Sequence, residues 1–229
     1  MTPSVDQSVV ALVPMRHHSQ RVEGKNYRQI AGQPLYAYIL ESLTQCKTIS
    51  KIIVDTDSPE ITRGIQELFP QIMLIDRPEH LIADDVPMNE ILLHDVELVD
   101  SKFYLQTHCT NPLLRAGTIA NAIQSFFEGW PDKDSLFSVT PFHTRFWTTK
   151  GEPINHNPHE LIPTQNLEPL FLENSCLYIF SEEGLKEKGH RIGERPILFE
   201  IDHEEAVDID TEWDFKLAEW LLQARQSNA

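Results

Sequence analysis

Residues 9–38, VVALVPMRHHSQRVEGKNYRQIAGQPLYAY, contain the features that decide the fold of this chain. An apolar run, residues 9–14, ends in a polar loop, and helical spacing resumes at Leu35. Although Asp and Glu outnumber Lys and Arg by 35 to 19 in the chain, this loop gathers Arg16, Arg21, Lys25 and Arg28. Open α/β sheets bind phosphate groups at a cationic, glycine-containing loop after the first buried strand. The stretch therefore predicts an α/β fold with a phosphate-binding first loop, although the loop by itself would also suit a solvated surface.

Strand and helix patterns alternate along the rest of the chain. Short apolar runs predict buried strands at residues 9–13, 51–55, 72–75, 103–106, 135–139, 176–180 and 197–201. Apolar spacings of three and four predict helices around residues 35–43, 61–69, 88–99, 119–127 and 213–221. The last of these is marked by Trp213, Leu217, Trp220 and Leu221. This alternation predicts one α/β domain over residues 1–229, with a mostly parallel sheet that helices cover on both faces. Residues 141–172 break the pattern with prolines, and loops of this length usually serve function or engage a partner.

Composition limits the class of protein and its surroundings. A formal net charge of −16 argues against binding to nucleic acid or to an anionic membrane, because both need a positive surface. No apolar stretch reaches the ~20 residues of a membrane span, and the N-terminus has no basic region typical of a secretory signal. Three distant cysteines, Cys46, Cys109 and Cys176, form no disulfide or metal framework. These features predict a soluble, cytoplasmic protein.

Two groups of residues carry chemistry. No P-loop or dinucleotide fingerprint is present, but Arg16, Ser19, Arg21 and Lys25 on one turn would suit a triphosphate. Asp208 and Asp210 lie two residues apart, so in a strand both carboxylates point to one side and can share a hard cation. The same two acids would also suit the positive end of the following helix. Thr211 and Asp214 form a variant of the capping box at that helix.

The chain resembles the cytidylyltransferases that activate acidic sugars, the CMP-N-acetylneuraminate and CMP-KDO synthetases. Matches run in order over residues 8–223: the first loop with Arg16, Ser19, Arg21, Gly24, Lys25 and Asn26, then AGQPL (31–35), IVDTD (53–57), RPEHL (77–81), His94, TNPL (110–113), Glu173–Asn174 with Tyr178, and VDIDT (207–211) through Ala218–Glu219. A single one of these motifs would be weak, but their common order along nearly the whole chain is specific.

The resemblance implies a fold, a reaction and a set of site residues. It implies a doubly wound sheet of the nucleotide-diphospho-sugar transferase type, and a homodimer to which the insertion at 141–172 contributes. A 2-keto-3-deoxy sugar acid would react with CTP to give the CMP-sugar and pyrophosphate, with Mg²⁺ held by Asp208 and Asp210. The implied nucleotide-binding residues are Arg16, Ser19, Arg21, Lys25, Asn26 and Arg77, with Asn26 and Arg77 on the side of the base. Arg16 and Lys25, together with Asp210, are the implied catalytic residues. The acidic sugar would contact His108, Gln165 and Asn174.

Some residues depart from the family pattern. His17 and His18 replace glycines of the sialic-acid branch, Gln20 replaces a lysine, and His108 stands where those enzymes often have glutamine. Residues 163–167 lack both arginines of a basic stretch. These departures favour an acceptor other than N-acetylneuraminate, such as a pseudaminic or legionaminic acid. Two alternatives stay open: a nucleotidyltransferase for a sugar phosphate, and a nucleotide-binding protein without turnover.

Overall fold

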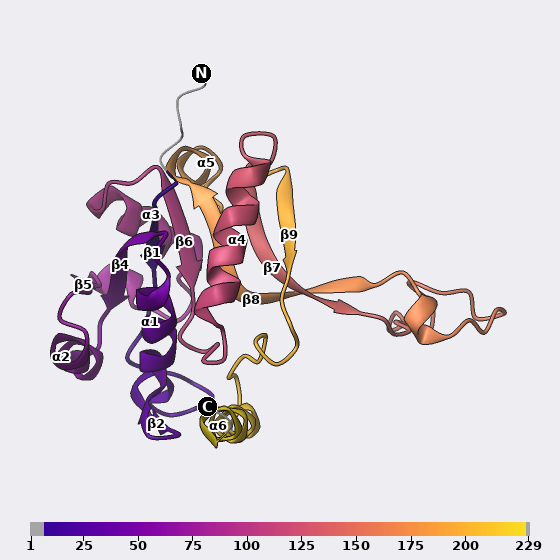
Figure 1. Ribbon diagram of the computed structural model, residues 1–229, viewed down its shortest axis with the longest axis horizontal. Helices are drawn as coiled ribbons and strands as arrows, with labels where there is room; N and C mark the ends of the chain where they lie inside the picture. The colour runs from indigo at the N-terminus through magenta and orange to yellow at the C-terminus, as the bar shows by residue number, and fades with distance from the viewer. Residues whose placement is uncertain (1–6, 228–229) are drawn as a thin grey trace.

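The seven apolar runs form one sheet in the computed structural model, which describes residues 7–227 (Figure 1). The strand order is β5-β4-β1-β6-β8-β7-β9, with β1 at Val9–Leu12, β4 at Ile49–Thr56, β5 at Met73–Asp76, β6 at Phe103–Thr107, β7 at Ser135–Phe142, β8 at Leu170–Ser181 and β9 at Pro196–Glu200. Within this sheet β8 alone runs antiparallel to its neighbours, so the predicted mostly parallel sheet is confirmed. A separate antiparallel pair joins β2 (Gln29–Ile30) and β3 (Gln33–Pro34). The expectation that no secretory signal is present rests on residues 1–6, which lie outside the described residues.

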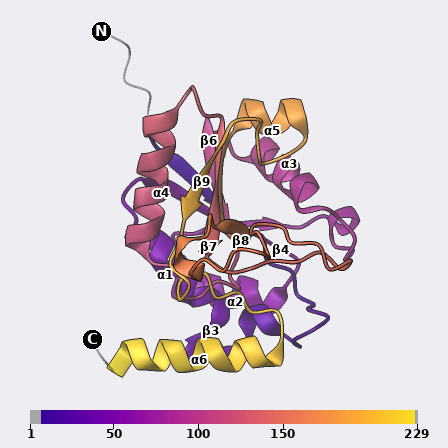
Figure 2. The ribbon, with the colours of Figure 1, turned by 90° about the vertical axis from the view of Figure 1, so that its right-hand side faces the viewer.

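Helices cover both faces of the sheet (Figure 2). One face packs against α1 (Leu35–Gln45), α2 (Pro59–Leu68) and α4 (Ala116–Gly129), whose apolar side chains share one buried cluster with the strands. The other face packs against α3 (Met88–Leu98) and α5 (Glu182–Lys188) in a second cluster. The double cover is therefore as predicted, but the short helix α5 was not predicted. None of the helices within residues 7–227 has the length and apolarity that a membrane span would need.

The last helix, α6 (Glu212–Ser227), is the C-terminal segment and packs against the first loop. Its buried residues Phe215, Ala218 and Leu222 share a third apolar cluster with Val22 and Ile30. Trp213 and Trp220, which marked the helix in the sequence, are instead 63% and 58% exposed and lie edge to face. The helix was thus predicted correctly, but its buried face was not.

Strands β7 and β8 continue beyond the body of the sheet as a hairpin that carries a projecting arm, residues 143–169 (Figure 1). Pro141 and Phe142 pair with Phe171 and Leu170. The irregular segment is therefore shorter at both ends than the predicted residues 141–172, because two antiparallel strands joined by a hairpin keep pairing up to the arm. Within the arm, the turn η3 (Thr164–Asn166) contains Gln165.

Candidate active site

A cavity of about 580 Å³ opens where the parallel strands β1 and β6 end, the edge at which α/β sheets bind ligands. Its walls come from the first loop, the segment after β5, the end of β6 and the segment before α6. Nine of the predicted site residues line it: Arg16, Ser19, Arg21, Lys25, Asn26, Arg77, His108, Asp208 and Asp210.

The backbone of the first loop is fixed at both of its ends. Gly24 has φ +60°, and a Cβ on it would lie 3.0 Å from the ring of Tyr27, so glycine is needed where the loop turns into η1 (Lys25–Tyr27). The buried Asn26 donates from Nδ2 to the Arg16 carbonyl over 2.8 Å, and its Oδ1 accepts from Cys109 Sγ over 3.2 Å. Asn26 was predicted to contact the nucleotide base. Its amide also closes the loop and ties it to the end of β6.

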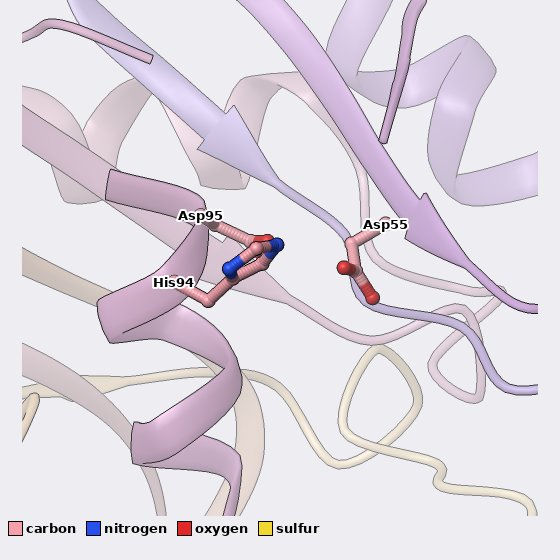
Figure 3. A group of neighbouring side chains, drawn as sticks. All are labelled: Asp55, His94 and Asp95. Carbon is pink, nitrogen blue, oxygen red and sulfur yellow. The ribbon is translucent and has the colours of Figure 1, made fainter. Parts of the chain in front are cut away.

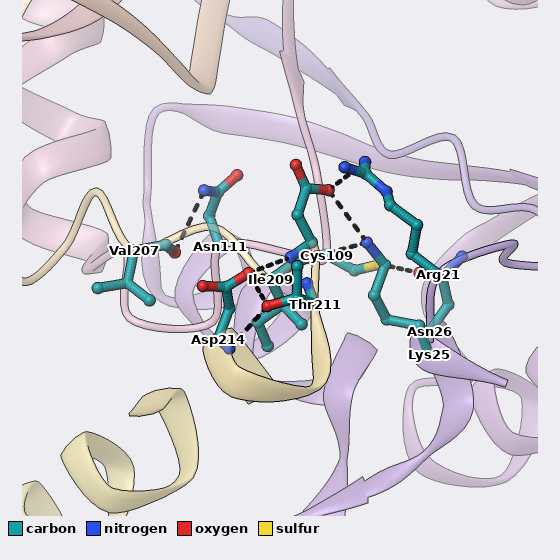
Figure 4. Close-up of polar contacts among 10 residues, drawn as sticks. Arg21, Lys25, Asn26, Cys109, Asn111, Val207, Ile209, Thr211 and Asp214 are labelled. Carbon is teal, nitrogen blue, oxygen red and sulfur yellow. Dashed lines mark hydrogen bonds and ion pairs between the residues drawn. The ribbon is translucent and has the colours of Figure 1, made fainter. Parts of the chain in front are cut away.

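Two cations of the first loop converge on the segment before α6 (Figure 4). Lys25 Nζ donates to the Ile209 carbonyl and lies 3.7 Å from Asp210 Oδ1. Arg21 Nη2 is 2.6 Å from the same oxygen. The Lys25 side chain is only 11% exposed, so its charge acts in a shielded environment where electrostatic interactions are stronger than in water. The fold thus joins the two groups that the sequence had indicated separately.

Asp208 is the residue best suited to hold a metal ion. Its Oδ1 is buried and has no hydrogen-bond partner among the described residues. Burial, and to a lesser degree Asp210, raises the pKa of the Asp208 carboxyl above its usual value. A divalent cation would satisfy this oxygen and favour the ionised form, and oxygen donors are the ligands that Mg²⁺ prefers. The two carboxylates therefore fit the predicted metal pair.

Asp84 is a cavity residue that sequence reasoning missed. It accepts from Arg16 Nη1 and from Gln20 Nε2 across the mouth of the cavity. The Arg16 and Asp84 side chains are 43% and 49% exposed, so an anionic ligand can compete with Asp84 for Arg16. The sequence feature that could have pointed to Asp84 is the acidic pair Asp84–Asp85, which lies between the end of β5 and helix α3.

The two histidines that replace family glycines lie in different surroundings. His17 turns towards the start of α2: its backbone N–H donates to Asp57 over 2.7 Å, and its Nδ1 lies 2.9 Å from Ser58 Oγ. Its ring also stacks on Tyr27. His18 lines the cavity. His17 therefore anchors the loop to the protein body, whereas His18 is available to a ligand.

Arg77, predicted to lie near the nucleotide base, is buried and paired with Asp55. Asp55 lies beside His94 and Asp95 (Figure 3). Arg77 Nε donates to Asp55, and the second carboxylate oxygen of Asp55 is buried with no hydrogen-bond partner within residues 7–227. One side-chain ligand atom from each of Asp55, His94 and Asp95 lies within 4.8 Å of the other two. The Arg77 guanidinium neutralises the charge of Asp55. The second buried carboxyl, Asp95, is therefore neutralised by its own proton rather than by a metal ion. Burial, followed by the charge of Asp55, raises the pKa of Asp95 to about 8.

This raised pKa predicts a pH-dependent effect of Asp95→Asn. The folded protein keeps the Asp95 proton up to about pH 8, whereas the unfolded chain releases it near the ordinary value of 3.8. The wild type therefore loses stability relative to the variant as pH rises through this window. We expect the melting temperature of Asp95→Asn, minus that of the wild type, to increase between pH 5 and pH 8. A constant difference would contradict the assignment, and Asp76→Asn, at an exposed position, is the matched control.

The three residues predicted to contact the sugar are not brought together. His108 lines the cavity at the end of β6. Asn174 is buried within the sheet, where its Nδ2 donates to Thr140 Oγ1 over 2.9 Å and its Oδ1 accepts from Ser138. Gln165 lies in the projecting arm, and neither Gln165 nor Asn174 is among the cavity-lining residues. A contact of Gln165 or Asn174 with the sugar stays a prediction.

Fold and site together are typical of one class, the α/β nucleotidyltransferases, with a cationic loop at the end of the first strand. The sequence model of the cytidylyltransferase family matches residues 10–228. The chain therefore belongs to the cytidylyltransferase family, and the resemblance found in the sequence is confirmed.

Relatives with assigned names are distant but cover nearly the whole chain. The CMP-N,N'-diacetyllegionaminic acid synthase of Legionella pneumophila is 27% identical over 95% of this chain and 97% of its own length. Post-translational flagellin modification protein B of Campylobacter coli is 24% identical over 96% and 97% of the two chains. The N-acylneuraminate cytidylyltransferase of Escherichia coli is 23% identical, and the match spans 52% of its length. CMP:2-keto-3-deoxy-manno-octonic acid synthetase, solved with CTP, has the same fold at a TM-score of 0.72 and 14% identity, over 95% of this chain and 99% of that one.

Proposed function

We propose that this protein transfers CMP from CTP to an acidic nine-carbon sugar and releases pyrophosphate. The observation that carries the proposal is the convergence of Arg21 and Lys25 with Asp208 and Asp210 at the mouth of one cavity. A cationic loop beside a carboxylate pair is the arrangement that a nucleoside triphosphate and its divalent cation would need. The names of the legionaminic and neuraminic acid relatives support a CMP-sugar as the product.

The first loop is the part of this acidic protein that can hold a triphosphate. Arg16 and Arg21 offer forks that match two phosphate oxygens, Ser19 offers a hydroxyl, and Lys25 offers a compact charge. In the absence of ligand, Asp84 and Asp210 neutralise these cations. The triphosphate would replace Asp84 as the partner of Arg16. We assign the base end of the nucleotide to the side of the cavity with Asn26 and Arg77.

The chemical step requires mainly positioning and neutralisation of charge. The anomeric hydroxyl oxygen of the sugar would attack the α-phosphorus of CTP and lose its proton to water. The bond from the α-phosphorus to the oxygen bridging to the β-phosphate would break, and pyrophosphate would leave. Lys25, shielded and fixed by the Ile209 carbonyl, is placed to stabilise the developing negative charge. Asp208 and Asp210 would hold Mg²⁺, which when bound neutralises phosphate charge.

The acceptor is the least determined part of the proposal. His108 is the one predicted sugar contact that lines the cavity. Because His108 stands where sialic-acid enzymes often have glutamine, we rank a legionaminic or pseudaminic type of acid above N-acetylneuraminate. The predicted homodimer also stays a prediction.

Pyrophosphate release tests the function directly. Each of the four nucleoside triphosphates would be assayed with Mg²⁺ and with N-acetylneuraminate, KDO, a legionaminic acid, a pseudaminic acid or a sugar 1-phosphate. Of the four nucleoside triphosphates, we expect only CTP to give pyrophosphate release, and only when an acidic sugar is present. Release with the sugar 1-phosphate would favour a different acceptor class, and binding of CTP without any release would favour a protein without turnover.

A further inference from the structure

Gln106, the second-to-last residue of β6, links the half-buried Arg191 to the cavity. Its side chain is fully buried, and its Oε1 accepts a hydrogen bond from Arg191 Nη1. Its Nε2 lies 3.0 Å from the Thr107 carbonyl and 3.0 Å from His108 Nε2. Arg191 and His108 are therefore joined through one amide whose orientation is fixed.

The chemistry of Arg191 fixes the direction of each hydrogen bond that the Gln106 amide makes. A guanidinium has only donors, so the amide must present its oxygen to Arg191 and its NH₂ group to the other two partners. The NH₂ group donates to the Thr107 carbonyl and to His108 Nε2. Nitrogen Nε2 of His108 must then be an acceptor and carry no proton. A neutral imidazole with an unprotonated Nε2 has its proton on Nδ1.

His108 is neutral at physiological pH. Burial, and then the positive charges of Arg191 and Lys25, lowers the pKa of His108 to about 3. The ring therefore exists as one of its two neutral tautomers, and the Gln106 amide selects between them. Since Nε2 is occupied by Gln106, the Nδ1–H group is the donor that this ring can offer to the cavity that it lines.

Arg191 is itself held by contacts beyond Gln106, and it forms no close ion pair with an acid within the described residues. Its guanidinium lies 3.5 Å from the centroid of the Tyr178 ring, and its backbone N–H donates to Asn89. None of the ion pairs found within residues 7–227 includes Arg191. A glutamate at position 106 would pair with Arg191 but would accept from His108 as well, which would place a proton on Nε2. Glutamine is therefore the residue that leaves Nε2 free of a proton.

We propose that Arg191 and Gln106 are positioning residues that hold His108 in its Nδ1–H tautomer, so that the cavity presents a neutral donor to the carboxylate of the acidic sugar. The assignment of the sugar as the ligand rests on the proposed function, whereas the tautomer does not. A neutral donor suits this place because Lys25 and Arg21 already supply the charge for the phosphates. Arg191 and Gln106 would thus affect binding of the acidic sugar and not binding of CTP.

Nitrogen-15 NMR of the whole protein, labelled at histidine, tests the tautomer without any substrate. The His108 resonances are assigned by their loss in His108→Asn. We expect a pyridine-like Nε2 and a pyrrole-like Nδ1 in the wild type, and a protonated Nε2 in Gln106→Glu. A protonated Nε2 in the wild type, or an unprotonated Nε2 in Gln106→Glu, would overturn the proposal. Lys186→Met, which removes an exposed cation on α5, should leave the His108 signals unchanged.

Steady-state kinetics then test the ligand. Gln106→Glu should raise KM for the acidic sugar by about tenfold or more, the usual effect of losing a hydrogen bond to a charged group, with KM for CTP within about twofold. His108→Asn, whose amide NH₂ reproduces a donor near the Nδ1 position, should retain more acceptor affinity than His108→Ala. An increase confined to KM for CTP would overturn the assignment to the sugar. If no acidic sugar is turned over at all, the proposed function fails while the NMR result on the tautomer still stands.

Discussion

Asp210→Asn is expected to lower kcat by about 100-fold or more, the size typical of losing one charge-stabilising element of an active site. Asp210 accepts from Arg21 and lies 3.7 Å from Lys25, so it orients both cations as well as serving as a proposed metal ligand. Asparagine keeps the volume but loses the charge. The measurement is the initial rate of pyrophosphate release at saturating CTP, acidic sugar and Mg²⁺.

The matched control for this experiment is Asp132→Asn. Asp132 is exposed and lies outside the cavity, so the same change of charge there should leave kcat unaltered. Unchanged turnover of Asp210→Asn at saturating Mg²⁺, together with an unchanged Mg²⁺ requirement, would remove Asp210 from the site. A raised Mg²⁺ requirement with a normal kcat would restrict its role to metal affinity.

Arg77→Met is expected to destabilise the protein by about 3–5 kcal/mol, because it leaves a buried carboxylate without its counter-charge. The Arg77 and Asp55 side chains are 3% and 0% exposed, so water cannot take over the role of the guanidinium. A loss of this size corresponds to a fall in melting temperature of roughly 6–20 °C for a chain of this length. Without Arg77, the pKa of the Asp55 carboxyl should rise further, so the deficit should be larger at pH 8 than at pH 5.

Two companion variants separate the buried charge from a simple loss of packing. Arg77→Met combined with Asp55→Asn removes both charges and should recover much of the lost stability. Arg63→Met removes a 76% exposed arginine and should change the free energy of unfolding by less than about 1 kcal/mol. If the double variant is no more stable than Arg77→Met, the unpaired charge is not the cause. Equal deficits at pH 5 and pH 8 would lead to the same conclusion.

Most strands and helices were predictable because their apolar spacing reports directly which side chains are buried. The helix α5 escaped because its seven residues bury one side chain, Leu185, which gives no periodic pattern. Its boundary signals were nevertheless present: Ser181 caps the start and accepts from Gly184 N–H, and Gly189 adopts φ +63° at the end. The buried face of α6 was mistaken because size suggested the tryptophans, whereas the surface that α6 meets accommodates Phe215 and Ala218.

The site shows a similar division. Chemical type and order along the chain were enough to select Lys25, Asp208 and Asp210, since phosphate and metal binding need these groups. Asp84 was missed because its partner Arg16 is 68 residues away in the sequence. The place of Asn174 within the sheet likewise depends on the pairing of β8 with β7, which no local pattern reveals.

The sequence by itself determined the family, the alternation of strands and helices, and the residue types proposed to bind a triphosphate. These properties are local, because they depend on the spacing of apolar residues and on the chemistry of single side chains. The tertiary structure alone decided which charges neutralise one another, that Asp55 and Arg77 are buried together, and that Gln106 contacts both Arg191 and His108. Those properties depend on burial and on contacts between distant segments. A low dielectric environment and a fixed geometry give these contacts their strength, and both exist only once the chain is folded.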